Sequence, residues 1–156
     1  MTDSLDDLYE EVGRVVVPGA VLEQALTSIA YGALGGGDAA REITHGLPLA
    51  QVQAHIETEA KARPAEWWSA RSLDLLTRIA QPLQARHRVV HGYWTDLRGI
   101  VDGKSFVTFK PDRQSRMWQA QHFDGTQLRA LASELRDLSL EAREIADRLI
   151  DEVEGR

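Results

Sequence analysis

Apolar residues recur at helical spacing through most of the chain. The pattern predicts a first helix over residues 5–34, which Pro18 is expected to kink or restart, because proline lacks a backbone N–H and clashes with the preceding turn. Three consecutive glycines at 35–37 disfavour a helix and predict its end. A second helix is predicted over 48–62, because Pro48 suits the first position of a helix.

A third helix is predicted from about residue 65 to Gly92, since glycine suits the C-terminal end of a helix. Pro82 is expected to kink this helix, because it removes the hydrogen bond to the carbonyl of Arg78. The residues expected to face inward are Trp68, Leu75, Leu76, Ile79, Leu83 and Val90.

The period of the pattern changes after the third helix. Three short segments rich in β-branched or aromatic residues, 93–98, 105–110 and 117–123, are separated by the turn pairs Asp102-Gly103 and Pro111-Asp112. They predict a small antiparallel meander. The meander must pack on the helices, because an isolated hairpin is only marginally stable in water.

The last segment carries the clearest helical signal. Asp124 or Thr126 is positioned to cap a helix. The apolar positions that follow alternate between spacings of three and four, as in a heptad seam: Leu128, Leu131, Leu135, Leu138, Ala142, Ile145 and Leu149. Two interpretations stay open, a long helix of the bundle or a helix whose seam also contributes to a dimer.

These elements together predict one domain over residues 1–156 that is mainly α. The fold class is a helical bundle with a small antiparallel β meander, about 93–123, inserted before the long C-terminal helix.

Composition narrows the class of protein. Apolar residues make up 43% and charged residues 27% of the 156 residues, which is usual for a soluble globular chain. Cysteine is absent, which excludes disulfides, a thiol nucleophile and iron–sulfur clusters. The first residues are acidic where a signal peptide is basic, and the longest apolar stretch, 15–22, is far shorter than the roughly 18 residues of a membrane span. We therefore expect a cytoplasmic protein with no membrane partner.

The net charge of −6 is unevenly distributed along the chain. Residues 1–60 hold 2 basic and 10 acidic residues, whereas residues 61–124 hold 11 basic and 6 acidic ones. The negative net charge of the chain argues against strong non-specific binding of nucleic acid. The basic middle of the chain is compatible with a local phosphate site or with a solvated helix surface.

Four polar residues gather at the end of the third helix: Arg86, His87, Arg88 and His91. Cleavage of RNA by its own 2′-hydroxyl needs a base, an acid and fixed positive charge, and histidine and arginine supply all three without a metal. Alternatively, these cations cap the negative end of the helix dipole. The two histidines have metal-ligand spacing, but the neighbouring arginines repel a cation. We expect no metal and no cofactor.

The pattern Arg86-His87-x-x-x-His91 resembles the R-x4–6-H motif of the HEPN superfamily, which lies near the end of a late helix of an α-bundle. The resemblance implies a metal-independent endoribonuclease in which two copies of the chain line one cleft, often a toxin or a phage-defence protein. Arg86 then matches the motif arginine that clamps phosphate, and His91 the motif histidine that acts as general base or acid. His87 matches its polar neighbour, which orients the site or shares proton transfer. A β meander is not part of a minimal HEPN bundle.

Arg88, Tyr93 and Trp94 flank the motif and are our candidates for binding the substrate. The tryptophans of this chain either stack on bases or, as is commoner, anchor a core. The leading hypothesis is a homodimeric endoribonuclease that acts on RNA. The alternative is a non-catalytic HEPN-like module that binds a nucleotide, RNA or a protein such as an antitoxin. A purely structural bundle with a polar helix end is the third interpretation.

Overall fold

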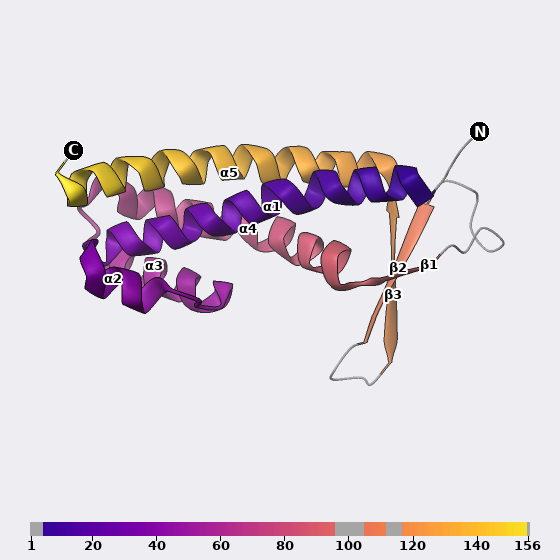
Figure 1. Cartoon of the computed structure of the whole chain (residues 1–156), viewed down its shortest axis with the longest axis horizontal. Helices are drawn as coiled ribbons and strands as arrows, with labels where there is room; N and C mark the ends of the chain where they lie inside the picture. Colours follow the sequence, from indigo (N-terminus) through magenta and orange to yellow (C-terminus); the bar gives the residue numbers. More distant parts are fainter. Residues whose placement is uncertain (1–4, 96–104, 112–116, 156) are drawn as a thin grey trace. The chain divides into compact units, whose positions relative to one another are not determined.

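The computed structural model describes residues 5–95, 105–111 and 117–155 (Figure 1). The described part is mainly helical, with a three-stranded antiparallel sheet before the final long helix, which confirms the predicted fold class. In chain order the elements are α1 (Leu5–Ala33), α2 (Gly37–Thr44), α3 (Leu49–Ala62), α4 (Trp67–His91), β1 (Tyr93–Thr95), β2 (Ser105–Pro111), β3 (Trp118–Asp124) and α5 (Gly125–Glu154).

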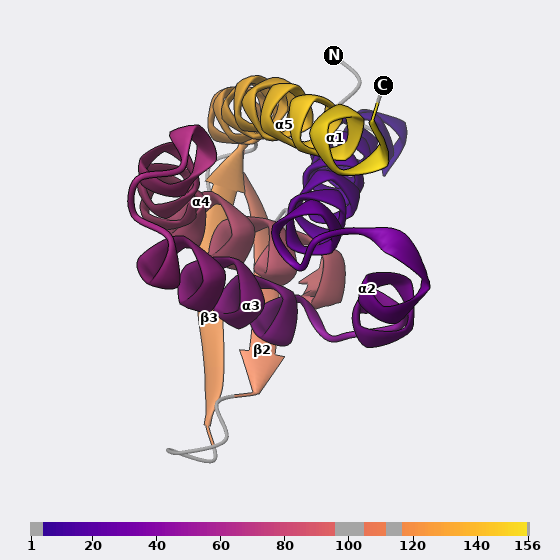
Figure 2. The same cartoon turned by 90° about the vertical axis from the view of Figure 1, so that its left-hand side faces the viewer.

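The chain falls into two compact units, each described by itself. Unit 1 comprises Met1–Gly19 and Gln81–Leu135, and it contains the sheet and the end of α4. Unit 2 comprises Ala20–Ala80 and Arg136–Arg156, and it contains α2 and α3, both labelled in Figure 2. That residues 1–156 form a single domain stays a prediction.

The core of unit 2 is built from apolar residues of four helices. They are Leu22, Leu26 and Ile29 of α1, Val52 and Ile56 of α3, Leu75 and Ile79 of α4, and Ile145 and Leu149 of α5. A Cβ atom added to Gly32 of α1 would lie 2.9 Å from the Cβ of Leu149, so the two helices approach closely there. The missing side chain of the glycine is what allows this approach.

Helix α1 runs through Pro18 without a break, so the restart expected there does not occur. Val15 and Leu22, on either side of the proline, are fully buried. Their burial offsets the hydrogen bond that proline removes, since a buried side chain of this size stabilises by about 1.5–3 kcal/mol. The stretch Tyr9–Ala33 is long and apolar enough to cross a membrane by length and composition, and 44% of its most apolar window is buried inside the protein.

The glycines after α1 end that helix as predicted, but they also begin another one. Gly35, Gly36 and Gly37 all have positive φ, and α2 starts at Gly37. The Tyr31 hydroxyl accepts a 2.9 Å hydrogen bond from the backbone N–H of Gly37 and so supplies a cap from the preceding helix. The apolar pattern does not predict α2, because the glycines and Pro48 on either side of this short segment indicate a loop.

Helix α4 also continues through its proline, and Pro82 is buried. Trp68, Leu75, Ile79 and Leu83 are buried as expected. The last inward residue differs from the prediction, because Val89 is 1% exposed whereas Val90 is only half-buried. The buried positions Leu75, Pro82 and Val89 lie seven residues apart, which keeps them on one face of the helix.

The sheet has the strand order β1-β2-β3 and is antiparallel throughout. Trp94 of β1 pairs with Thr108 of β2, which in turn pairs with Gln121 of β3. Pro111 ends β2 opposite Trp118, so this proline belongs to a strand and not to the predicted turn. The predicted Asp102-Gly103 turn and residues 96–98 of the first predicted strand lie outside the described residues.

Helix α5 begins with a reciprocal cap that confirms Asp124 as a capping residue. Asp124 Oδ1 accepts a 2.7 Å hydrogen bond from the N–H of Gln127, and Gln127 Oε1 accepts a 2.9 Å bond from the N–H of Asp124. This is a capping box built from Asp and Gln. All seven residues of the predicted seam, from Leu128 to Leu149, are buried within one copy of the chain. The seam therefore belongs to the bundle.

Candidate functional site

The candidate site lies in unit 1, on the last two turns of α4 and the strand that follows. His87 and His91 are both exposed, and their ring centroids are 4.5 Å apart with the planes tilted by 51°. Residues four apart on a helix face the same side, which is why the two imidazoles meet. The structure thus brings the two predicted histidines into contact at the surface.

Arg86 lies beside this pair in sequence but makes its own contact. The side chain is half-buried, and its Nε atom is buried. Its stem packs against Gly19 of α1, because a Cβ atom added to Gly19 would lie 2.9 Å from both Cγ and Nε. Arg86 is therefore held against another helix, whereas the histidines face solvent.

Arg88 is half-buried and is tied to the sheet. Its Nη2 donates to the side-chain oxygen of Gln119 in β3 at 3.2 Å, and its Nη1 donates to the backbone carbonyl of Gln119 at 3.4 Å. A guanidinium that spans both acceptors links the end of α4 to the third strand. The role predicted for Arg88 in binding the substrate stays a prediction.

The two predicted aromatic residues lie in β1. Trp94 is half-buried, its indole N–H donates a 2.8 Å hydrogen bond to the carbonyl of Val89, and its ring lies 5.9 Å from that of Phe123. The backbone of Tyr93 pairs with Phe109, and its side chain lies outside what the structure describes. Trp94 thus has a structural contact of its own, and its predicted role toward a substrate stays a prediction.

Gly92 joins α4 to β1 at a very close approach to β2. Its N–H donates a 2.8 Å hydrogen bond to the carbonyl of Arg88, and a Cβ atom added to it would lie 1.6 Å from Thr108 Oγ1. Thr108 is fully buried. Any larger residue at position 92 would displace either the helix end or the strand, so Gly92 fixes the position of His91, its neighbour in sequence.

Gly19, Thr108 and Gln119, which surround the motif from three other elements, could not be found from the sequence. In the sequence pattern Gly19 only interrupts an apolar stretch, and Gly92 only ends a helix. No local signal marks Thr108 or Gln119, because their neighbours are set by the pairing register of β2 and β3. Among the residues that the structure describes, no group of three or more His, Cys, Asp or Glu side chains could hold a metal ion.

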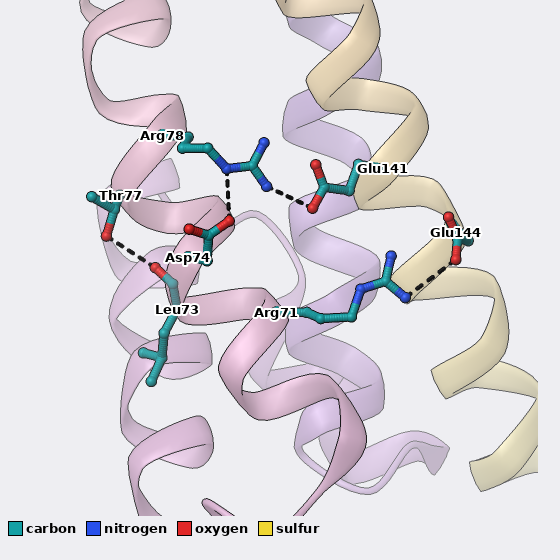
Figure 3. A network of polar contacts seen from close by, with 7 residues as sticks. All are labelled: Arg71, Leu73, Asp74, Thr77, Arg78, Glu141 and Glu144. Carbon is teal, nitrogen blue, oxygen red and sulfur yellow. Dashed lines mark hydrogen bonds and ion pairs between the residues drawn. The ribbon is translucent and has the colours of Figure 1, made fainter.

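Part of the basic middle segment is neutralised by acidic residues of α5, in unit 2 (Figure 3). Arg78 donates to Glu141 at 2.6 Å and to Asp74 at 2.7 Å, and Arg71 donates to Glu144 at 3.2 Å. The hydrogen bonds to Glu141 and then to Asp74 raise the pKa of Arg78 above its ordinary value, against the effect of burial. These two arginines act as parts of a solvated helix surface.

The tryptophans in unit 2 serve the fold. Trp68 is buried, and Trp67 donates a 2.9 Å hydrogen bond to Glu152 while the guanidinium of Arg148 lies 3.9 Å above its ring. In unit 1, by contrast, Trp118 of β3 is 64% exposed.

No protein-family model matches this chain, no curated protein matches it, and no solved structure matches it. The proposed function therefore rests on the motif residues and the contacts that surround them.

Proposed function

We propose that the chain is a cytoplasmic, metal-independent endoribonuclease of the HEPN type. The observation that carries the proposal is the exposed pair His87 and His91, with rings 4.5 Å apart, next to an arginine whose stem is held against α1. Histidine exchanges protons near neutral pH, and arginine offers fixed positive charge to phosphate oxygens. A site with these groups has what RNA cleavage through the 2′-hydroxyl requires.

The reaction proceeds by attack of the 2′-oxygen on the adjacent phosphorus. One imidazole takes the proton of the 2′-hydroxyl as the new P–O bond forms, and an imidazolium gives a proton to the 5′-oxygen as the old P–O bond breaks. The products are a 2′,3′-cyclic phosphate and a 5′-hydroxyl. His91 acts as base or acid, and Arg86 stabilises the charge that develops on the phosphorane oxygens.

The distance between the two imidazoles supports a site shared by two copies of the chain. In-line displacement places the attacking and leaving oxygens on opposite sides of the phosphorus. A phosphate with both esterified oxygens does not fit between rings whose centroids are 4.5 Å apart, so His87 and His91 of one copy cannot serve the two sides. A homodimer in which each copy supplies one acid–base histidine satisfies this requirement, and His87 then orients its neighbour.

The proposed biological setting, a toxin or phage-defence protein controlled by an antitoxin-like partner, follows from the resemblance of Arg86-His87-x-x-x-His91 to the HEPN motif alone.

The test is cleavage of a mixed RNA pool in EDTA by wild type, His91→Ala and Arg86→Ala. His122→Ala is the matched control, because His122 is an exposed histidine of β3 outside the motif. We expect wild type and His122→Ala to cleave, and the two motif variants to lose at least about 100-fold in rate, the contribution usual for a general acid or base and for a group that stabilises transition-state charge. Equal cleavage by His91→Ala and wild type would refute the proposed mechanism.

A second candidate function is a non-catalytic module that binds RNA or a nucleotide. The 4.5 Å distance between the rings of His87 and His91 favours it, because one copy of the chain then has no acid and base on opposite sides of a phosphate. This candidate predicts that wild type binds RNA but leaves it intact in EDTA. Binding is then measured by fluorescence anisotropy of a labelled single-stranded RNA, with His122→Ala again as the control.

A further inference from the structure

Gly19, in the middle of α1, is buried and lies directly against the side chain of Arg86 in α4. A Cβ atom at position 19 would lie 2.9 Å from Arg86 Cγ, 2.9 Å from Nε and 3.2 Å from Cδ. Real Cβ atoms essentially never approach other atoms closer than 3.0 Å. Both residues belong to unit 1. Arg86 therefore occupies the space that any other residue at position 19 would take.

The other two glycines of α1 do not have this relation to the motif. Gly13 is exposed, and a Cβ atom added there would meet nothing within 4 Å. Gly32 lies against Leu149, an apolar contact of the core. Helix propensity offers no reason for a glycine beside Pro18, because both residues disfavour a helix interior. The close approach of Arg86 supplies the reason.

We infer that Gly19 is a positioning residue for Arg86. Its missing side chain lets α1 hold the arginine stem in one place, with the Nε atom buried. A guanidinium that is restrained before it meets a phosphate loses less conformational freedom on binding than a mobile one. This inference rests on the proposed function only for what the positioned guanidinium then does, namely clamp the phosphate of an RNA substrate.

The contact is tested by a double-mutant cycle of Gly19→Ala and Arg86→Ala, read by thermal unfolding, with Gly13→Ala as the matched control. Gly13→Ala should raise the Tm by about 2–4 °C, because alanine favours the helix and nothing is displaced. Gly19→Ala should lower the Tm when Arg86 is present, because the arginine stem must move. In the Arg86→Ala background the same change should raise the Tm, as it does at position 13.

An equal effect of Gly19→Ala in both backgrounds would overturn the inference, because residues in contact are expected to be non-additive. If Gly19→Ala alone does not fold, thermal unfolding of the double variant Gly19→Ala/Arg86→Ala tests the contact. A Tm at or above that of Arg86→Ala supports the contact, and failure of the double variant to fold refutes it. These readouts need no RNA cleavage, so they stand whether or not the proposed function does.

The positioning role is tested by RNA cleavage at a temperature at which every variant is folded. Gly19→Ala should lower kcat about 10- to 100-fold with little change in KM, since displacement of a clamp by about 1 Å has effects of this size. Gly13→Ala should match wild type. A Gly19→Ala variant with the wild-type kcat would overturn the positioning role. If the Tm effects in the double-mutant cycle are nevertheless non-additive, the contact exists but contributes only to packing. A wild type that cleaves nothing refutes the proposed function, and the Tm cycle alone then decides whether the contact exists.

Discussion

The indole N–H of Trp94 donates a 2.8 Å hydrogen bond to the backbone carbonyl of Val89. Trp94 is in β1, and Val89 is buried near the end of α4, so this bond fastens the strand to the helix that carries His87 and His91. A carbonyl in the last turn of a helix has no partner within the helix. Trp94 supplies one from outside, and its ring packs against Phe123 of β3.

Replacing Trp94 by phenylalanine should therefore mainly lower the stability of the fold and should affect RNA cleavage less. The variant keeps an aromatic ring but loses the donor to the Val89 carbonyl, which costs about 0.5–1.5 kcal/mol and lowers the Tm by about 1–6 °C. Trp118→Phe is the matched control, because Trp118 is 64% exposed. Thermal unfolding followed by circular dichroism is the measurement. A Tm loss that is equal in the two variants would contradict the structural role of Trp94.

Arg86 and Arg88 should differ in how their removal changes the salt dependence of RNA binding. Each phosphate contact to a single strand contributes about 0.7 to the slope of log K against log salt. In a His91→Ala background, which blocks the proposed cleavage, Arg86→Ala should lower the slope by about 0.7. Arg88→Ala should lower it less, because two hydrogen bonds to Gln119 hold the Arg88 guanidinium on β3, whereas Arg86 is the proposed phosphate clamp. The slopes are obtained from anisotropy titrations of a short RNA, and an equal loss in both variants would count against the contact with Gln119.

The capping box of α5 gives a prediction about stability alone. Asp124→Ala removes the acceptor for the N–H of Gln127 and should destabilise the protein by about 1 kcal/mol, or about 2–4 °C in Tm. Asp124→Ser keeps an acceptor and should retain most of the stability. Gln127→Ala loses only the return bond and should have a smaller effect. A serine variant as unstable as the alanine variant would show that the cap does not depend on this acceptor.

The pairing of Arg78 with Glu141 and Asp74 predicts a contribution to stability that is independent of pH near neutrality. The hydrogen bonds to Glu141 and Asp74 raise the pKa of Arg78. A base whose pKa is raised by folding contributes its full share of the protein's stability below its unfolded-state pKa. That contribution is lost only at strongly alkaline pH. The Tm difference between wild type and Arg78→Gln should therefore stay constant from about pH 6 to about pH 10, where the carboxylates are also ionised.

The size of that difference is limited because the Arg78 side chain is 43% exposed. An ion pair of this kind contributes at most about 1 kcal/mol, and added salt should reduce it. Arg143→Gln, a change at an exposed arginine of α5, is the control for the loss of one positive charge. A Tm difference that grows with salt would contradict the ionic origin of the effect.

The long helices could be predicted from the sequence because their apolar spacing is regular, and the strands because short segments rich in β-branched or aromatic residues are separated by turn residues. The helix breakers were harder to interpret. Pro18 and Pro82 lie inside continuous helices because buried residues on both sides of each hold the helix together. Conversely, Gly37 starts α2 where three glycines predicted only the end of a helix. A single residue's preference is a weak signal when packing or a cap from Tyr31 opposes it.

The contact between His87 and His91 could also be predicted, because residues four apart meet on any helix. The surroundings of the motif could not. The contact of Arg88 with Gln119 depends on how β3 pairs with β2, and that of Arg86 with Gly19 depends on how α1 packs against α4. Both are long-range relationships that no local pattern encodes.

The proposed function requires that His91 supports cleavage by the 2′-hydroxyl of RNA without a metal. The most direct test compares an RNA oligonucleotide with its fully 2′-O-methylated counterpart in EDTA, with the products identified by mass spectrometry. We expect wild type to cleave only the RNA, every new 3′ end to carry a 2′,3′-cyclic phosphate, and His91→Ala to cleave neither substrate. Cleavage of the methylated strand, or cyclic phosphate ends produced equally by His91→Ala, would contradict the proposed function.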